Sequence, residues 1–483
     1  MTTEGTDAKP HRRIRVRAIA GLVVAGLVIG SLALVAVTVV RARTTAAAAT
    51  SGPSGVTPSA APASATASIA TPGVEPATPA PTSTPLPAPS VREFFVARGT
   101  EPAISADPFH PGVVAVVSEY IFMNTSKSGC SMPAVRISQD GGATWGQPTY
   151  PWRGGCQDIH AVLAWGPNSR LWAGDAVGAP GGVAMSVSFS DDLGGNWSVP
   201  FVEPFTPGWT GCFPAIGVDN WPASPNFGTV YVAYNWLPSN YGPGVGVMAS
   251  RDGATWAFAN VTVDTLPGYP FASRIGYRVQ AAPDGTAFVS FYQSDLKLWD
   301  KTRVLNEGSP DNIGRMGFEI ARLHFNAGTL SADLPAWATD VDHTDAQWQS
   351  GLAVDSSGRP WLAVESEGRI GFGGLDGKWR EFAIPGKYSF KPSLAISGRT
   401  VFLGWHAQAN DGYVWTYYTL SYDGGATFLP PALVTDTSWT PRDADVINGV
   451  GLRENAAIDN GVVYYAYGDA RSGLSVYMAR ITA

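Results

Sequence analysis

From Val91 onward, short apolar runs alternate with Gly, Pro, Asn and Asp, and one pattern recurs. A strand of small and apolar residues is followed by a turn and then by a strand rich in Val, Tyr, Phe and Trp. Short strands bounded by turn residues are typical of all-β folds. The pattern occurs seven times, over 101–120, 160–175, 213–236, 278–292, 349–365, 391–406 and 453–469. It therefore predicts seven structural repeats.

A third apolar strand follows each pair, and in several repeats a turn and a fourth strand follow it. Units of four antiparallel strands repeated around an axis form a β-propeller. The sequence thus predicts an all-β propeller with seven four-stranded blades. A six-bladed propeller is the alternative, in which the fourth repeat (278–330) is an irregular insertion.

The two ends of this region predict how the ring closes. The last repeat stops at its third strand, Leu474–Ile481, and the apolar segment Val91–Ala97 precedes the first inner strand without a partner. An unpaired strand edge is an aggregation hazard that folded proteins avoid. We therefore expect Val91–Ala97 to pair with Leu474–Ile481 and to complete the last blade.

The N-terminal part has a different composition. Residues 1–17 are polar and basic, whereas residues 18–40 carry no charge, a length that spans a hydrocarbon core of about 30 Å as a helix. The excess of arginines before this segment predicts a transmembrane helix with a cytoplasmic tail, 1–17, and the remainder outside. A cleaved signal peptide is the alternative, but its apolar region would be unusually long, and Arg41 and Arg43 stand where small residues should lead into cleavage.

Residues 41–90 consist mainly of Ala, Thr, Ser and Pro and contain no aromatic residue. Such a composition cannot bury a core and predicts a disordered linker. Residues 1–43 carry a net charge of +5 and residues 44–90 a charge of −1, so residues 91–483 carry −11 of the total of −7. An acidic propeller domain argues against nucleic acid as the main partner. These features together predict a propeller, 91–483, held outside a cell membrane.

A second pattern closes four of the predicted third strands: SQDGGATW (138–145), SDDLGGNW (190–197), SRDGATW (250–256) and SYDGGATF (421–428). An aspartate in such a turn accepts backbone N–H groups, and glycine supplies the positive φ. A terminal aromatic ring is long enough to wedge between neighbouring sheets. We therefore interpret as structural the four aspartates and the four rings, which are Asp140, Asp192, Asp252, Asp423, Trp145, Trp197, Trp256 and Phe428.

These turns resemble the Asp-box (BNR) repeats of the sialidase-like β-propeller family, and the resemblance covers most of residues 91–483. The copies at 138–145 and 421–428 fit the motif well, whereas 190–197 has Asn196 in place of Thr and 250–256 is one residue short. In that family the boxes lie on the face away from the active site, and they also recur in non-enzymatic members. The family's Arg-Ile-Pro motif is missing between Val91 and Ser138, and no tyrosine nucleophile can be assigned.

Ligands of a propeller usually bind at the face where the inner strands begin. Aligning the seven repeats places one residue of each there: Glu101, His160, Phe213, Arg278, Gln349, Lys391 and Arg453. Converging cations attract a carboxylate or sulfate, and sialidases hold their substrate's carboxylate with an arginine triad in comparable places. The candidate ligand cations are therefore Arg278, Lys391 and Arg453, with Arg274 nearby.

Other interpretations of these residues stay open. Glu101 and Glu454 could neutralise two of the cations, which would leave no anion site. His160 could act as a base oriented by Asp158, or it could be a solvated loop histidine.

Three cysteines, Cys130, Cys156 and Cys212, precede strands at the same predicted face. Outside the cell, one pair could form a disulfide, either Cys130–Cys156 or Cys156–Cys212, with one thiol left over. No Cys/His spacing indicates zinc and no Gly-rich loop indicates a phosphate site, so we expect neither a metal nor a cofactor.

The preferred prediction is a monomeric, membrane-anchored propeller that recognises a surface or extracellular ligand, an anionic glycan, at the face where its inner strands begin. A sialidase-like exo-glycoside hydrolase is the first alternative. A scaffold that binds a surface protein through exposed Trp and Tyr side chains is the second.

Overall fold

The computed structural model describes residues 88–122, 130–151, 160–179, 182–203, 212–236, 244–261, 273–294, 316–341, 349–440 and 454–482. These residues form 28 β-strands and one short 3-10 turn, η1 (Pro167–Ser169). In these ranges no helix is long and apolar enough to cross a membrane. The predicted tail 1–17, the predicted transmembrane helix 18–40 and nearly all of the linker 41–90 lie outside the described residues.

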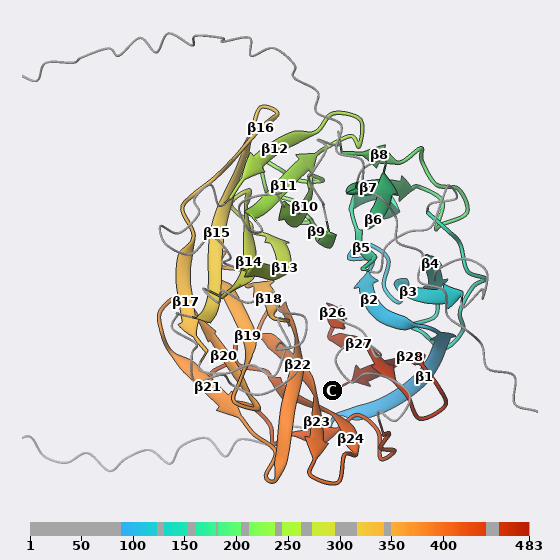
Figure 1. Cartoon of the computed structure of the whole chain (residues 1–483), viewed down its shortest axis with the longest axis vertical. Coiled ribbons are helices and arrows are strands. Elements are labelled where there is room, and N and C mark those ends of the chain that lie inside the picture. The colour runs from blue at the N-terminus through green and yellow to red at the C-terminus, as the bar shows by residue number, and fades with distance from the viewer. Residues whose placement is uncertain are drawn as a thin grey trace, which may run out of the picture. The chain divides into compact units, whose positions relative to one another are not determined.

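The strands form seven sheets arranged as blades around a central axis (Figure 1). Blade 1 contains β2 (Thr100–Ala106), β3 (Val114–Phe122) and β4 (Cys130–Ser138). Blade 2 contains β5 (Val162–Trp165), β6 (Leu171–Ala179), β7 (Gly182–Ser190) and β8 (Phe201–Val202). Blade 3 contains β9 (Cys212–Val218), β10 (Val230–Trp236), β11 (Gly244–Ser250) and β12 (Ala257–Asn260).

The remaining blades follow in chain order. Blade 4 contains β13 (Ser273–Ala281), β14 (Thr286–Ser294), β15 (Met316–Asn326), β16 (Thr329–Ala332) and β17 (Ala336–Asp340). Blade 5 contains β18 (Gly351–Val354), β19 (Pro360–Ser366), β20 (Arg369–Gly374) and β21 (Trp379–Phe382). Blade 6 contains β22 (Lys387–Ser397), β23 (Thr400–Ala409), β24 (Val414–Ser421) and β25 (Ala432–Leu433).

Blade 7 joins the two ends of the propeller. It contains β26 (Asn455–Asp459), β27 (Val462–Asp469), β28 (Ser475–Thr482) and, as its outermost strand, β1 (Ser90–Arg98). β1 pairs antiparallel with β28, with Val91 opposite Ile481. The predicted closure of the last blade is therefore confirmed.

The blade count agrees with the first of the two sequence predictions. The fourth repeat forms its own sheet, in which β17 pairs with β15 beside β16. It is a blade and not an insertion, so the six-bladed alternative is wrong. In blade 1 the fourth position holds only a bridge between Val135 and Thr149.

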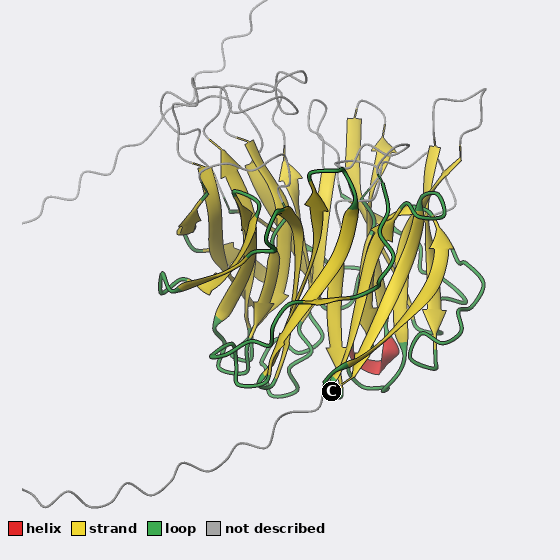
Figure 2. Ribbon diagram, turned by 90° about the horizontal axis from the view of Figure 1, so that it is seen from below, coloured by secondary structure: helices red, strands yellow, loops and turns green. Residues whose placement is uncertain are grey.

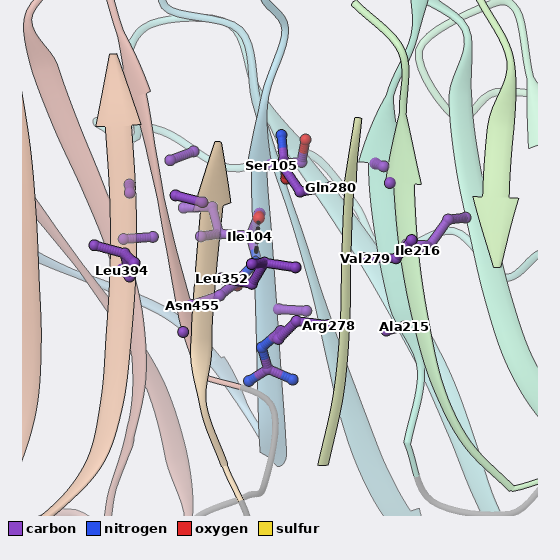
Figure 3. Close-up of a pocket in the computed structure, with 18 of the residues that line it drawn as sticks. Ile104, Ser105, Ala215, Ile216, Arg278, Val279, Gln280, Leu352, Leu394 and Asn455 are labelled. Carbon is purple, nitrogen blue, oxygen red and sulfur yellow. Dashed lines mark hydrogen bonds between the residues drawn. The ribbon is translucent and has the colours of Figure 1, made fainter. Parts of the chain in front are cut away.

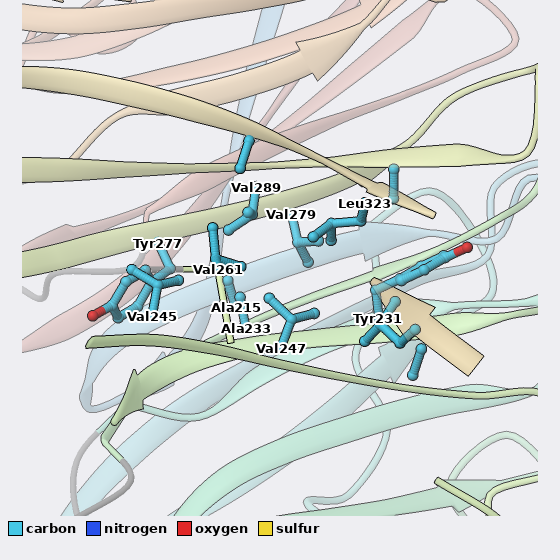
Figure 4. Close-up of a cluster of buried hydrophobic side chains, with 14 of the residues drawn as sticks. Ala215, Tyr231, Ala233, Val245, Val247, Val261, Tyr277, Val279, Val289 and Leu323 are labelled. Atoms are coloured by element: carbon cyan, nitrogen blue, oxygen red, sulfur yellow. The ribbon is translucent and has the colours of Figure 1, made fainter. Parts of the chain in front are cut away.

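The core is divided among the blade junctions. Seven clusters of buried apolar side chains each combine residues from two adjacent blades. Between blades 3 and 4, Val247 and Tyr231 face Val279 and Val289 (Figure 4). Burial of apolar surface contributes roughly 25 cal/mol per Å², so each blade is stabilised mainly by its two neighbours.

The two faces of the ring differ in what they carry. We call the face where the inner strands begin the mouth face, and the opposite face, where the first and second strands of each blade are joined, the turn face. The Ser-x-Asp turns lie at the turn face, because Gly141 N donates to Gly112 O over 2.8 Å and Gly424 N donates to Arg399 O over 2.8 Å. Figure 2 shows η1 and the C-terminal end of the chain at this face.

Hydrogen bonds within each turn explain its residue pattern. Ser138 Oγ donates to Asp140 Oδ1 over 2.7 Å, and the backbone N–H of Gly142 donates to Ser138 Oγ over 2.8 Å. The hydroxyl and N–H of Thr144 both donate to Asp140 and lower the pKa of its carboxyl to about 2. Gly142 has a φ of +88°, a backbone conformation that strains any residue with a side chain and therefore favours glycine.

The second and third turns, whose sequences depart from the pattern, keep the hydrogen bonds to their aspartates in different ways. In the second turn, Asn196 Nδ2 donates to Asp192 Oδ2 over 2.6 Å in place of a threonine hydroxyl. In the shorter third turn, the backbone N–H groups of Ala254 and Thr255 donate to Asp252 over 2.8 Å each. The aromatic ring after each turn packs against the cluster shared with the preceding blade; these rings are Trp145, Trp197, Trp256 and Phe428.

Candidate functional site: the mouth of the central channel

The inner strands of all seven blades line a central cavity of about 260 Å³. Its wall is formed mostly by the backbone and by apolar side chains such as Ile104, Ile216, Leu352 and Leu394. The strands alternate in side-chain direction, so every second residue of each inner strand faces the axis. The cavity is large enough for a single small ligand or a group projecting from a larger one.

Arg278 supplies a positive charge to this cavity. Its side chain extends from β13 into the space between the inner strands (Figure 3). Its Nη1 donates to the carbonyl of Tyr277 over 3.1 Å, and the side chain is partly exposed. A guanidinium presents several donors in one plane, which suits a carboxylate or sulfate. This geometry places one sequence-predicted ligand cation on the cavity surface.

Asn455 ties the ring together beside the same cavity. Its Oδ1 accepts from the backbone N–H of Ile104 over 2.6 Å, and its Nδ2 donates to the carbonyl of Ile104 over 2.9 Å. These two bonds join the inner strand of blade 7 to that of blade 1. These hydrogen bonds therefore connect the last blade to the first at the wall of the cavity.

The residues aligned at the mouth have unusual backbone geometry. Four of them have positive φ values, namely Glu101 (53°), His160 (131°), Phe213 (54°) and Lys391 (55°). Three are followed by a proline, and strand pairing shifts register at each of these three points. Backbone strain of this kind costs on the order of 1–3 kcal/mol per residue and concentrates at functional sites. The same bulge therefore recurs at the mouth in blades 1, 3 and 6.

Blades 1 and 2 form a buried acid–histidine cluster at the mouth. His160 Nδ1 lies 2.9 Å from Glu101 Oε2, and both side chains are almost fully buried. Glu119, on β3, accepts N–H bonds from the backbone of His160 and of Ala161. Burial raises the pKa of Glu119 well above its usual value, and the nearby Glu101 and Asp175 raise it further. The cluster therefore brings two carboxyl groups and an imidazole together, and burial disfavours ionisation of Glu119.

Blades 6 and 7 form a second buried histidine–carboxylate pair. His406 Nε2 lies 2.9 Å from Glu454 Oε2, and neither side chain is exposed. Glu454 Oε1 also accepts the backbone N–H of Gly468 over 2.9 Å, and Thr416 Oγ1 lies 3.1 Å from His406 Nδ1. Both histidine pairs therefore connect neighbouring blades at the mouth.

The other sequence-predicted residues are distributed as follows. Lys391 is fully buried and does not line the cavity. Arg453, Asp158 and Cys156 lie outside the described residues, and so do the side chains of Arg274, Cys130 and Cys212. His160 is 3% exposed, so it is not a solvated loop histidine. Its imidazole ring stacks on Phe213 with ring centroids 4.2 Å apart. Glu101 and Glu454 each contact a histidine, His160 and His406 respectively.

Sequence reasoning missed a second layer of polar residues at the mouth. They lie near the mouth ends of the second strands and are all buried: Glu119, Asp175, Gln293, Glu365, His406 and Asp469. The available signal was a polar residue near the end of an otherwise apolar second strand, as in VAVVSEY, WLAVES and VFLGWH. Lys, Glu, Arg and Asp are rarely fully buried unless paired, so a charge repeated at this point indicates a polar layer.

No protein-family model matches the sequence, and neither does any curated protein. Solved structures to which this chain is similar include an ulvan lyase of polysaccharide lyase family 25 (14% identity, TM-score 0.46), for which the match covers 80% of this chain and 95% of the lyase. An α-L-arabinofuranosidase from Fusarium graminearum matches at 10% identity and a TM-score of 0.44, over 65% of this chain and 92% of that one. A Hadza microbial sialidase matches at 15% identity and a TM-score of 0.41, over 76% and 75%. At these values the likeness concerns the fold and carries no argument about activity.

Proposed function

We propose that this protein is a membrane-anchored propeller that binds an extracellular or surface ligand, an anionic glycan, at the mouth of its central channel. The observation that carries the proposal is the placement of Arg278, whose guanidinium enters the cavity. Residues 91–483 carry a net charge of −11 and Glu454 also lines the cavity, so the Arg278 guanidinium is the group there that would attract an anion.

The direction of the chain at its ends supports this role. β1 enters the propeller at Ser90, which pairs with Thr482 at the turn face, and β1 then runs toward the mouth face. An N-terminal anchor over 18–40 would therefore be connected to the propeller through β1, which begins at the turn face. Localisation at the cell membrane with the N-terminus in the cytoplasm is part of the proposal.

A glycan array tests the binding proposal. The full-length chain and the Arg278→Ala variant are compared with an Arg399→Ala variant, which removes an exposed arginine from the turn face. We expect wild type and Arg399→Ala to bind glycans with carboxylate or sulfate groups, and Arg278→Ala to lose at least tenfold in affinity, because a charge-assisted hydrogen bond contributes about 1.5–3 kcal/mol. Equal binding by all three proteins, or by none, would refute the role of Arg278.

Glycoside hydrolysis is the second candidate function, and the buried carboxyl of Glu119 favours it. Hydrolases pair a protonated carboxylic acid with an ionised carboxylate, and Glu119 with its raised pKa lies near Glu101 and Asp175. The experiment is release of the fluorophore from a fluorogenic sialoside between pH 4 and 8. Release that disappears in Glu119→Gln would establish this function, and no release across the range would exclude sialosides as substrates.

A further inference from the structure

Gln280 follows Arg278 by two residues on β13, and both side chains line the central cavity (Figure 3). Alternate residues of a strand point the same way and lie about 7 Å apart. Strand pairing places Arg278 opposite Ser290 and Gln280 opposite Phe288, beyond the bulge of blade 4. One strand therefore supplies the cavity with a cation and, one step further from the mouth, with an uncharged amide.

The other six blades have small residues at the position of Gln280. The pairing of each inner strand with the second strand of its blade identifies these counterparts as Ser105, Ala164, Gly217, Ala353, Ala395 and Ala457. All six line the cavity. The hydroxyl of Ser105 already accepts the backbone N–H of Trp165 over 3.1 Å. Among these seven residues Gln280 is therefore the long polar side chain, and the small ones leave room beside it.

The amide of Gln280 is available to a ligand. It forms no hydrogen bond with the residues that the structure describes, and the side chain is partly exposed. By contrast, the amide nitrogen and oxygen of Gln349 are buried, and Asn455 uses both ends of its amide on Ile104. A carboxamide offers two donor hydrogens and an acceptor oxygen, which suits a hydroxyl group.

The backbone of the cavity wall favours the same kind of ligand. The inner strand of each blade is the last strand of its sheet, so its inner edge has no strand partner in the described ranges. Backbone N–H and C=O groups on such an edge bond to water or to hydroxyl groups, whereas contact with hydrocarbon would leave them unsatisfied. A cavity of about 260 Å³ with this wall suits one hydroxylated ring better than an aliphatic chain.

We propose that Gln280 determines which anions the cavity accepts, an inference that rests on the function proposed for the mouth. The carboxylate or sulfate of a single acidic sugar ring binds Arg278, and a hydroxyl on the far side of that ring bonds to the amide of Gln280. The cavity thus selects a hydroxylated acid over an apolar acid of the same size. Gln280 acts on specificity, and Arg278 supplies the attraction to the charge.

Isothermal titration of the full-length chain with two acids tests this role. Glucuronic acid carries a carboxylate and hydroxyls on a six-membered ring, and cyclohexanecarboxylic acid carries a carboxylate on a six-membered ring without hydroxyls. We expect wild type to bind glucuronic acid at least fivefold more tightly. Gln280→Met keeps the length of the side chain without its amide, and it should weaken glucuronic acid about fivefold, as the loss of one neutral hydrogen bond does, and leave cyclohexanecarboxylic acid unchanged. Arg278→Ala should weaken both acids, and Arg399→Ala at the turn face should weaken neither.

The remaining outcomes separate this inference from the function on which it rests. Equal losses for the two acids in Gln280→Met would show a structural role, and unchanged affinity for both would show that Gln280 does not contact the ligand. Either result overturns the role of Gln280, while weakening of both acids in Arg278→Ala would still support the anion site. If neither acid binds wild type, the anion site at Arg278 fails and the inference fails with it.

Discussion

The ion pairs that connect β1 to blade 7 predict a large loss of stability from a single substitution. Arg471 Nη2 lies 2.8 Å from Glu93 Oε1 on β1, and Arg471 Nε lies 2.8 Å from Asp469 Oδ2. The three side chains are 14%, 21% and 0% exposed respectively. Tyr467 donates to Glu93 as well, and the guanidinium lies 4.1 Å from the centroid of the Tyr477 ring. Arg471 is therefore the shared partner of two carboxylates in the blade that closes the propeller.

Replacing Arg471 with Ala leaves both carboxylates without their cation. Removal of one partner from a buried ion pair costs about 3–5 kcal/mol, and we expect a loss of that size at pH 7 in urea denaturation followed by circular dichroism. Arg369→Ala is the control, because its pair with Glu381 is 53% and 63% exposed and such pairs contribute at most about 1 kcal/mol. If the two variants lose similar amounts of stability, the network does not hold β1 and the reasoning fails.

Two further predictions concern single carboxyl groups. Burial raises the pKa of Glu119, so the stability it contributes is complete below its unfolded pKa of about 4.5 and is lost as the pH rises. Glu119→Gln, which keeps an acceptor for the N–H groups of His160 and Ala161, should therefore melt above wild type at pH 8 and no higher at pH 4; a larger advantage at pH 4 would contradict this. The hydroxyl and N–H of Thr427 lower the pKa of Asp423 to about 2, so Asp423→Ala should lower the melting temperature at pH 7, and the difference should shrink as the pH falls from 4 to 2. A difference that is independent of pH would show that the ionised carboxylate is not what stabilises the turn.

The architecture was predictable because it follows from local patterns that repeat. Each blade brings its own apolar strands and turns, and seven copies at related spacing leave little freedom in how they are assembled. The closing strand was predictable because folded proteins avoid unpaired strand edges. The apolar segment before the first blade had no partner, and the last blade lacked a fourth strand. The register of Val91 with Ile481 confirms that the argument identifies a partner as well as a topology.

The mouth was less predictable because its side chains are directed by backbone features that local patterns do not encode. Alignment of the inner strands predicted that both Arg278 and Lys391 reach the mouth of the channel. Arg278 lines the cavity, whereas the side chain of Lys391 is buried and does not line it. Both blades have a bulge at this point, but Lys391 lies within the register shift between Phe390 and Ser393, whereas Arg278 is the first paired residue after the shift that begins at Ile275. A bulge of one residue reverses the direction of a side chain in a strand. Whether a charge reaches the channel therefore depends on where the residue lies relative to the bulge of its own blade.

The polar layer on the second strands shows why the mouth must be considered as a unit. Glu119 affects the site through His160, which comes from the next blade, and Glu454 is held by His406 from the preceding blade. Each of these contacts crosses a blade junction, so neither partner can be recognised within one repeat. Because the junctions are also where the apolar clusters lie, the packing that stabilises the ring fixes the distances between the ionisable groups. A substitution in a junction cluster near the mouth should for this reason change the distances between these ionisable groups.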